Sequence, residues 1–144
     1  MPLAIEVREP CGDAEFEQYC HLRWRILRQP LGLPRPLGPY EPGTIHLAAW
    51  MNGHAVATGR IYLDSPDQAH VRGVAVEPSC LRRGIGRAIV AELERRARER
   101  GATCTVLEAR YAAVAFFEKQ GYRAVGELPP EFHPVRCFRM FKKL

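Results

Sequence analysis

The chain has 144 residues, of which 47% are apolar and 26% are charged. That length fits one domain over residues 1–144, and the charged fraction is that of an ordinary soluble protein, which excludes a disordered chain. No apolar stretch reaches the ~20 residues of a membrane span, and acids occur within the first ten residues. Neither a membrane anchor nor a secretory signal is therefore expected.

The cysteines and arginines indicate the compartment and the charge of the ligand. Five cysteines, an odd number without a Cys-x-x-Cys spacing, argue against disulfides and a metal site and fit a cytoplasmic protein. Arginine outnumbers lysine by 18 to 3, which suits an anionic ligand, although a high-GC genome or a heat-adapted host gives the same bias. Most of the net charge of +5 lies in residues 82–100, where seven arginines stand against three glutamates.

A helix and a long loop are expected first. Apolar residues at spacings of four, four and three predict a helix over residues 13–27, with Arg23, Arg25 and Arg28 on its solvated face. Residues 30–43 contain five prolines and three glycines, which excludes a regular helix or a central strand. Interleaved apolar side chains indicate a packed loop that covers a binding site, with a disordered linker as the alternative. These side chains are Leu31, Leu33, Leu37 and Tyr40.

Three strands are expected next. The apolar runs 45–51 and 54–63 flank Asn52-Gly53, a strong signal for a two-residue hairpin turn. A β-branched run over residues 71–76 follows a Pro-Asp turn, so the three strands are expected to form an antiparallel meander.

The remaining elements predict an α+β fold with a mixed sheet. Residues 84–100 carry apolar side chains every four residues on one face, which predicts a helix. A buried strand over residues 103–109 follows, so this strand, the helix and the preceding strand form a right-handed βαβ unit with parallel strands. A third helix over residues 111–120 and two strands at about 123–127 and 135–141 complete the fold.

The loop between strand 71–76 and the next helix has the composition of a pyrophosphate site. Its two glycines let the backbone approach a ligand, and the first N–H groups of a helix have no partner within the helix. Three arginines add positive charge. A nucleotide P-loop is excluded because no Gly-Lys-Ser/Thr follows, and a dinucleotide fingerprint lacks its third glycine. The residues concerned are Arg82, Arg83, Gly84, Gly86 and Arg87.

The same segment resembles the signature of the GNAT superfamily of acetyl-CoA-dependent N-acetyltransferases. Residues 74–78, Val-Ala-Val-Glu-Pro, match the strand end, and residues 83–88, Arg-Gly-Ile-Gly-Arg-Ala, match the coenzyme loop. Residues 107–127 resemble a second family segment, and residues 22–34 resemble the start of some small bacterial members. The resemblance implies a GNAT-like mixed β-sheet with a central splayed parallel strand pair and flanking helices.

The resemblance also implies direct transfer of an acetyl group from bound acetyl-CoA, the cosubstrate, to a primary amine. Backbone N–H groups near Val74 to Val76 are expected to stabilise the thioester oxyanion. The strand pair 71–76 and 103–108 is expected to separate at its C-terminal end and admit pantetheine. The residues assigned to coenzyme binding are Val74, Ala75, Val76, Arg82, Arg83, Gly84, Ile85, Gly86, Arg87 and Phe117.

Phe117 departs from the family pattern. Many members have a tyrosine there that protonates the leaving thiolate, and phenylalanine has no proton to give. Either another side chain supplies the proton, or water protonates the departing thiolate, or the protein does not catalyse acetyl transfer. The alternative hypothesis is therefore a non-catalytic acyl-CoA-binding or sensor domain.

Four residues are candidates for proton transfer: Glu77, Glu108, His46 and Tyr111. The two glutamates follow the central strands, at whose carboxyl ends ligand sites gather. The alternatives are a solvated loop acid for Glu77 and a helix cap for Glu108. His46 is either a base near neutral pH or a structural residue of its strand. Tyr111 opens the third helix and is the candidate replacement for the missing acid.

The expected acceptor is a small-molecule or peptide amine, and no membrane partner is expected. Only the positive charge favours a nucleic-acid partner. Aromatic residues do not interleave with the arginines, so stacking of bases is not indicated. A homodimer is compatible with the sequence. Turnover of acetyl-CoA with a panel of amines separates enzyme from sensor, and strong salt dependence of binding would indicate nucleic acid.

Overall fold

The computed structural model describes residues 4–36 and 38–144, so Leu37 of the predicted loop lies outside the described residues. The strands are β1 (Glu6–Arg8), β2 (Ile45–Met51), β3 (His54–Ser65), β4 (Gln68–Val76), β5 (Cys104–Arg110), β6 (Arg123–Glu127) and β7 (Cys137–Lys143). The α-helices are α1 (Gly12–Leu27), α2 (Ile85–Glu99) and α3 (Val114–Lys119). Short 3-10 helices cover Gln29–Leu31, Pro78–Cys80, Tyr111–Ala113 and Pro130–Phe132.

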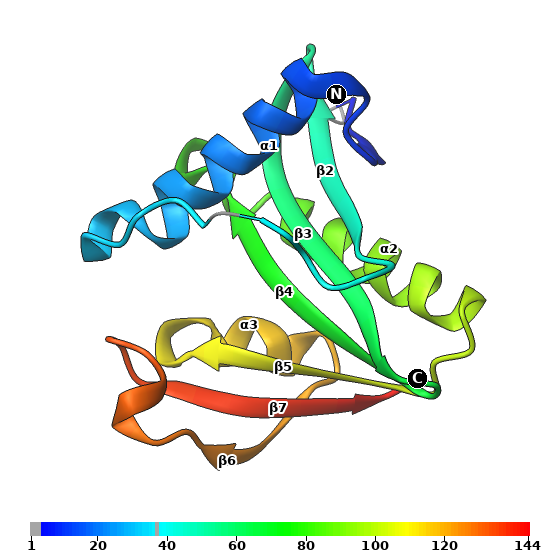
Figure 1. Ribbon diagram of the computed structural model, residues 1–144, viewed down its shortest axis with the longest axis vertical. Helices are drawn as coiled ribbons and strands as arrows, with labels where there is room; N and C mark the ends of the chain where they lie inside the picture. Colours follow the sequence, from blue (N-terminus) through cyan, green and yellow to red (C-terminus); the bar gives the residue numbers. More distant parts are fainter. Residues whose placement is uncertain (1–3, 37) are drawn as a thin grey trace.

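The strands form a seven-stranded mixed sheet in the order β1-β2-β3-β4-β5-β7-β6 (Figure 1). Among the strands of the described residues, β4 and β5 run parallel and the other neighbours are antiparallel. The predicted mixed sheet and its parallel pair are therefore confirmed. The predicted hairpin turn is also present, because Asn52 and Gly53 both have positive φ angles.

Two elements differ from the sequence prediction. The short strand β1 was not predicted, because three residues show no alternating pattern, yet they pair with Ala48, Ala49 and Trp50 at the edge of the sheet. The third helix is divided into a 3-10 turn and the six-residue helix α3. No helix within the described ranges is both long and apolar enough to cross a membrane.

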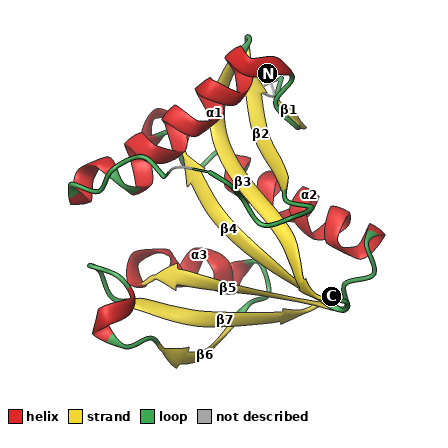
Figure 2. Ribbon diagram, viewed as in Figure 1, coloured by secondary structure: helices red, strands yellow, loops and turns green. Residues whose placement is uncertain are grey.

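Helices α1 and α2 cover opposite faces of the sheet (Figure 2). On β2, Leu47 belongs to the apolar cluster that includes Ile89 and Leu93 of α2. Its neighbour Ala48 belongs to a second cluster with Tyr19 of α1. Successive side chains of a strand point to opposite faces, so one strand supplies both apolar layers.

The parallel strands separate after three residues. Gln68 to His70 of β4 pair with Cys104 to Val106 of β5, and no pairing between the two strands follows within the described sheet. Figure 1 shows the two ribbons diverging from this point. The separation that the resemblance implied is thus present, and it divides the sheet into two parts with a gap between them.

Candidate active site

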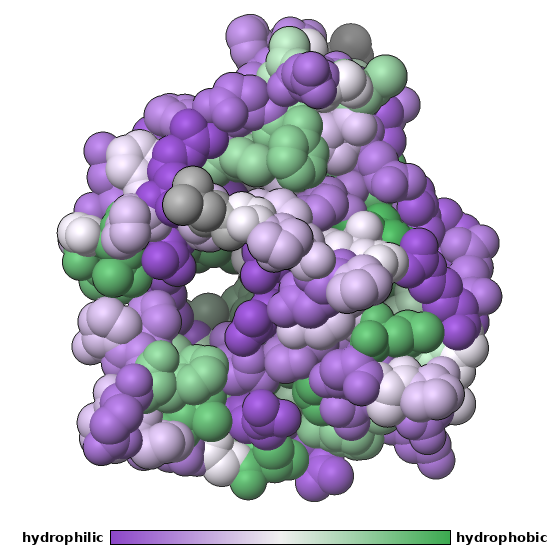
Figure 3. Space-filling view, in the orientation of Figure 1, coloured by the Kyte–Doolittle hydropathy of each residue, from purple (hydrophilic) through white to green (hydrophobic). Residues whose placement is uncertain are grey.

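An open cavity of about 540 Å³ lies where β4 and β5 separate. Its walls come from the end of α1, from the following loop, from strands β3, β4 and β5, and from residues 132–133. Figure 3 shows an opening over this gap, bordered mainly by hydrophilic residues. The volume is in the range of small-molecule sites.

A β-bulge marks the edge of the gap. Thr58 pairs with Ala75, but Arg60 pairs with Arg72, so two residues of β4 stand opposite one residue of β3. The first of the two, Gly73, has a φ of 64°, and a Cβ there would lie 3.1 Å from the side chain of Arg23. A bulge interrupts the hydrogen-bond ladder and leaves backbone groups unpaired. On its other side, β4 has no strand partner beyond His70 within the described sheet, so backbone groups that point toward β5 border the gap.

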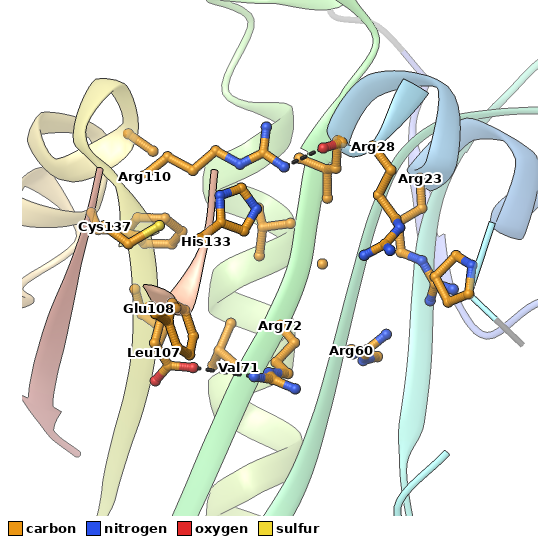
Figure 4. A pocket seen from close by; sticks show the side chains of 18 of the residues that line it. Arg23, Arg28, Arg60, Val71, Arg72, Leu107, Glu108, Arg110, His133 and Cys137 are labelled. Atoms are coloured by element: carbon orange, nitrogen blue, oxygen red, sulfur yellow. Dashed lines mark hydrogen bonds and ion pairs between the residues drawn. The ribbon is translucent and has the colours of Figure 1, made fainter. Parts of the chain in front are cut away.

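Arginines dominate the polar lining of the cavity, with Glu41 and Glu108 as its carboxylates. The arginines are Arg23, Arg28, Arg60, Arg72 and Arg110 (Figure 4). The expectation that Arg23 lies on a solvated face is wrong, because its relative exposure is only 3%. Its guanidinium group packs between helix and sheet, 5.4 Å from the ring centroid of Tyr19 and 5.2 Å from that of Tyr40.

Glu108 is the one predicted proton-transfer residue that lines the cavity. One carboxylate oxygen lies 2.8 Å from His70 Nε2 and 3.4 Å from Arg72, and the other lies 3.3 Å from Arg139. Burial raises the pKa of Glu108, but the hydrogen bond and charge of His70 and the two arginines outweigh it and lower the pKa below its usual value. The side chain is therefore ionised at neutral pH.

The other three candidates lie outside the cavity lining. Glu77 forms an ion pair with Arg25 of α1. His46 Nδ1 lies 2.8 Å from the hydroxyl of Tyr19, and burial with nearby arginine charges lowers its pKa to about 4. Tyr111 is 63% exposed.

His133 and Cys137 line the cavity but were missed from the sequence. They follow a proline-rich segment whose spacing carries no motif, so only the folded chain brings them to the gap. His133 Nδ1 accepts a hydrogen bond from the Val135 N–H at 3.1 Å, and burial with the charge of Arg110 lowers the pKa of His133. A neutral His133 thus carries its hydrogen on Nε2 and acts as a donor.

The predicted coenzyme loop lies at the start of α2. Arg82, Arg83 and Arg87 are exposed, and no side chain caps the helix, so its first N–H groups are without side-chain partners. A Cβ on the buried Gly86 would lie 3.1 Å from Phe116 and 3.2 Å from Val76. Gly86 therefore permits close packing of α2, and the exposed arginines and free amides fit a pyrophosphate group.

The remaining coenzyme candidates are distributed around the gap. Val74 and Phe117 line the cavity, whereas Ala75 and Val76 continue β4 beyond the bulge. The Phe117 ring is 7% exposed and packs 5.0 Å from Phe116 and 5.7 Å from Tyr122 between ring centroids.

Comparison with known proteins gives the family. Residues 9–122 match the model of the acetyltransferase (GNAT) family. The chain belongs to the GNAT family. This confirms the resemblance noted in the sequence, and it places the chain among the acyltransferases, whose donor is an acyl-CoA.

Solved structures agree with the GNAT fold. A GNAT-family acetyltransferase from Staphylococcus aureus superposes with a TM-score of 0.79 at 16% identity, covering 98% of this chain and 99% of that one. The ribosomal-protein-S18-alanine N-acetyltransferase from Escherichia coli gives 0.75 at 20%, covering 96% and 93%. An aminoglycoside 6′-N-acetyltransferase in complex with coenzyme A gives 0.75 at 19%, covering 98% and 97%. At these identities the similarity concerns the fold.

Proposed function

We propose that the protein transfers an acetyl group from acetyl-CoA directly to a primary amine. The observation that carries this proposal is the gap between β4 and β5, which has a β-bulge on one edge and opens onto the cavity. β5 no longer pairs with β4 beyond His70, so N–H groups of residues 74–76 that point toward β5 would be within reach of a thioester in the gap. Preorganised donors of this kind stabilise the negative charge that develops on a thioester oxygen.

The coenzyme is expected to approach from the α2 side. Backbone N–H groups of residues 82–87 and the side chains of Arg82, Arg83 and Arg87 would hold its pyrophosphate. Gly84 and Ile85 lie within the same turn. Phe117 would contact the pantetheine arm at the wall of the gap.

The reaction needs a neutral amine. Its nitrogen lone pair attacks the thioester carbonyl carbon, a C–N bond forms, the C–S bond breaks, and the amine loses one proton. Glu108 would accept that proton, and its carboxylate is held 2.8 Å from His70 Nε2 at the cavity wall. The thiolate takes its proton from water, since Phe117 offers none.

Acetyl-CoA turnover with a panel of primary amines tests the proposal. Release of free thiol is followed, and the acetylated amine is identified by its mass increase. Time-dependent formation of both products is expected, with a lower kcat in Glu108→Gln and the coenzyme KM nearly unchanged. Tight acetyl-CoA binding without turnover of any amine would overturn the proposal and favour the non-catalytic sensor.

A further inference from the structure

Three arginines from three elements converge on the α1 face of the sheet. Arg60 of β3 lies directly opposite Arg72 of β4 in the antiparallel register. Arg23 of α1 packs over the neighbouring Gly73. The guanidinium groups of Arg23 and Arg60 each lie 5.2 Å from the ring centroid of Tyr40. All three arginines line the cavity, as Figure 4 shows.

Two of these arginines have buried nitrogens without partners. Arg23 is only 3% exposed, and its Nε and Nη1 have no hydrogen-bond partner among the described residues; the same holds for the buried Nε of Arg60. Of the three arginines, only Arg72 has a carboxylate within 4 Å among the described residues, Glu108 at 3.4 Å. Residues 1–3 and 37 contain no acidic side chain.

This arrangement is costly without a further anion. A buried charge without a counter-ion loses its hydration, and like charges directly opposite each other on neighbouring strands repel. Burial lowers the pKa of the Arg60 guanidinium, and repulsion from the charges of Arg23 and Arg72 lowers it further. The Tyr40 hydroxyl satisfies only one nitrogen of Arg23. An anion among the three guanidinium groups would supply the missing negative charge and accept hydrogen bonds from the unpaired nitrogens.

We propose that the amine acceptor carries a carboxylate or phosphate group, which Arg23 and Arg60 bind with Arg72 beside them. This inference rests on the proposed function and specifies its substrate class. The anion is assigned to the acceptor because the coenzyme loop leads into α2 on the opposite face of the sheet, and no residue of that loop lines the cavity. The acceptor's amine then points from the arginines toward the gap.

Matched pairs of amines test the proposal. β-Alanine is compared with propylamine, and O-phosphoethanolamine with ethanolamine, each with acetyl-CoA. Charge-assisted hydrogen bonds predict a kcat/KM about 10- to 100-fold higher for at least one anionic member. Arg60→Met should reduce that ratio to near one, whereas Arg98→Gln, at an exposed position on α2, should preserve it. Equal rates within both pairs, or an unchanged ratio in Arg60→Met, would overturn the proposal.

A binding measurement separates this inference from the proposed function. With the coenzyme loop occupied by saturating coenzyme A, inorganic phosphate or malonate should raise the Tm of the wild type and of Arg98→Gln, and should leave the Tm of Arg60→Met and Arg23→Met unchanged. Without added anion, Arg60→Met should have a higher Tm than the wild type, because a repulsive charge has been removed. If the Tm values change in this way but no amine is acetylated, the anion site exists and the proposed acetyl transfer is wrong.

The anion that the three arginines bind could alternatively belong to the acyl chain of the donor. If Arg60→Met lowers kcat/KM for succinyl-CoA but not for acetyl-CoA, while the charge of the amine has no effect, the anion belongs to the acyl chain. That outcome would overturn the assignment to the acceptor.

Discussion

Phe117 offers no proton to a departing thiolate, and its ring is fixed by two aromatic neighbours at the cavity wall. Phe117→Tyr adds one hydroxyl there. General acid catalysis is typically worth ~10²–10⁴-fold, but a thiolate already leaves well, so we expect a kcat increase of about tenfold at most.

Tyr111 is the matched control for this change. It is 63% exposed and its ring lies 5.1 Å below the guanidinium of Arg136, outside the cavity lining. Tyr111→Phe is expected to leave kcat within about twofold of the wild type, since it removes the hydroxyl of an exposed side chain outside the cavity lining. A loss of tenfold or more in steady-state kcat would show that Tyr111 supplies the proton.

The arginines of the coenzyme loop give a second prediction for single residues. Replacing both Arg82 and Arg83 by alanine removes two exposed charges beside the α2 start. Coenzyme A affinity should fall about 5- to 50-fold, and its salt dependence should become weaker. Calorimetric titration at two salt concentrations measures both quantities. Equal affinities in the variant and the wild type would place the pyrophosphate elsewhere.

At the scale of elements, the loop after α1 is expected to select the acceptor. Pro36, Pro39, Tyr40 and Glu41 of this loop line the cavity on the α1 face. Tyr40→Ala removes the ring between loop and sheet, so we expect the acceptor KM to rise about tenfold and the acetyl-CoA KM to stay nearly constant. Steady-state kinetics with each substrate varied in turn is the measurement. A similar rise in both KM values would mean that the loop only supports the fold.

Local sequence patterns predicted most of the helices and strands, but they did not predict the arginine cluster of the cavity. Helical spacing, the Asn-Gly turn and the βαβ unit depend on neighbours in sequence, so helices α1 and α2 and strands β2 to β5 were expected near their observed positions. The arginine cluster depends on tertiary contacts. Arg23, Arg60 and Arg72 come from three elements, and an exposed arginine on a helix has the same local sequence as a buried one.

The coenzyme loop could be proposed from the sequence for the opposite reason. Its glycines, arginines and helix start lie within one short segment, so the sequence carries the whole motif. His133 shows the limit of this approach, because the turns after β6 bring it to the cavity and no spacing in the sequence indicates that contact.

At the scale of the whole molecule, His46 links stability to pH. Burial, with the charges of Arg23 and Arg60, lowers its pKa from 6.5 to about 4 in the folded protein. Between these values the unfolded chain binds a proton that the folded chain does not, so this group's stabilisation is complete above pH 6.5 and is lost as the pH falls toward 4. After allowance for partial exposure, the loss amounts to about 1–2 kcal/mol.

Denaturant unfolding at pH values from 4 to 7 measures this effect. The free energy of unfolding of His46→Gln should fall less steeply with decreasing pH than that of the wild type. His54→Gln, at an exposed position of β3, is the matched control and should follow the wild type. Parallel curves for His46→Gln and the wild type would contradict the assignment.

We infer that the coenzyme binds on the α2 side of the sheet and the acceptor on the α1 side, and that the two meet in one gap. A crystal structure of the complex with coenzyme A tests it most directly. We expect pyrophosphate oxygens on the N–H groups of residues 82–87 and the sulfur in the gap beside Val74, with Arg23 and Arg60 free of the coenzyme. Pyrophosphate or 3′-phosphate bound to Arg23 and Arg60 would contradict it.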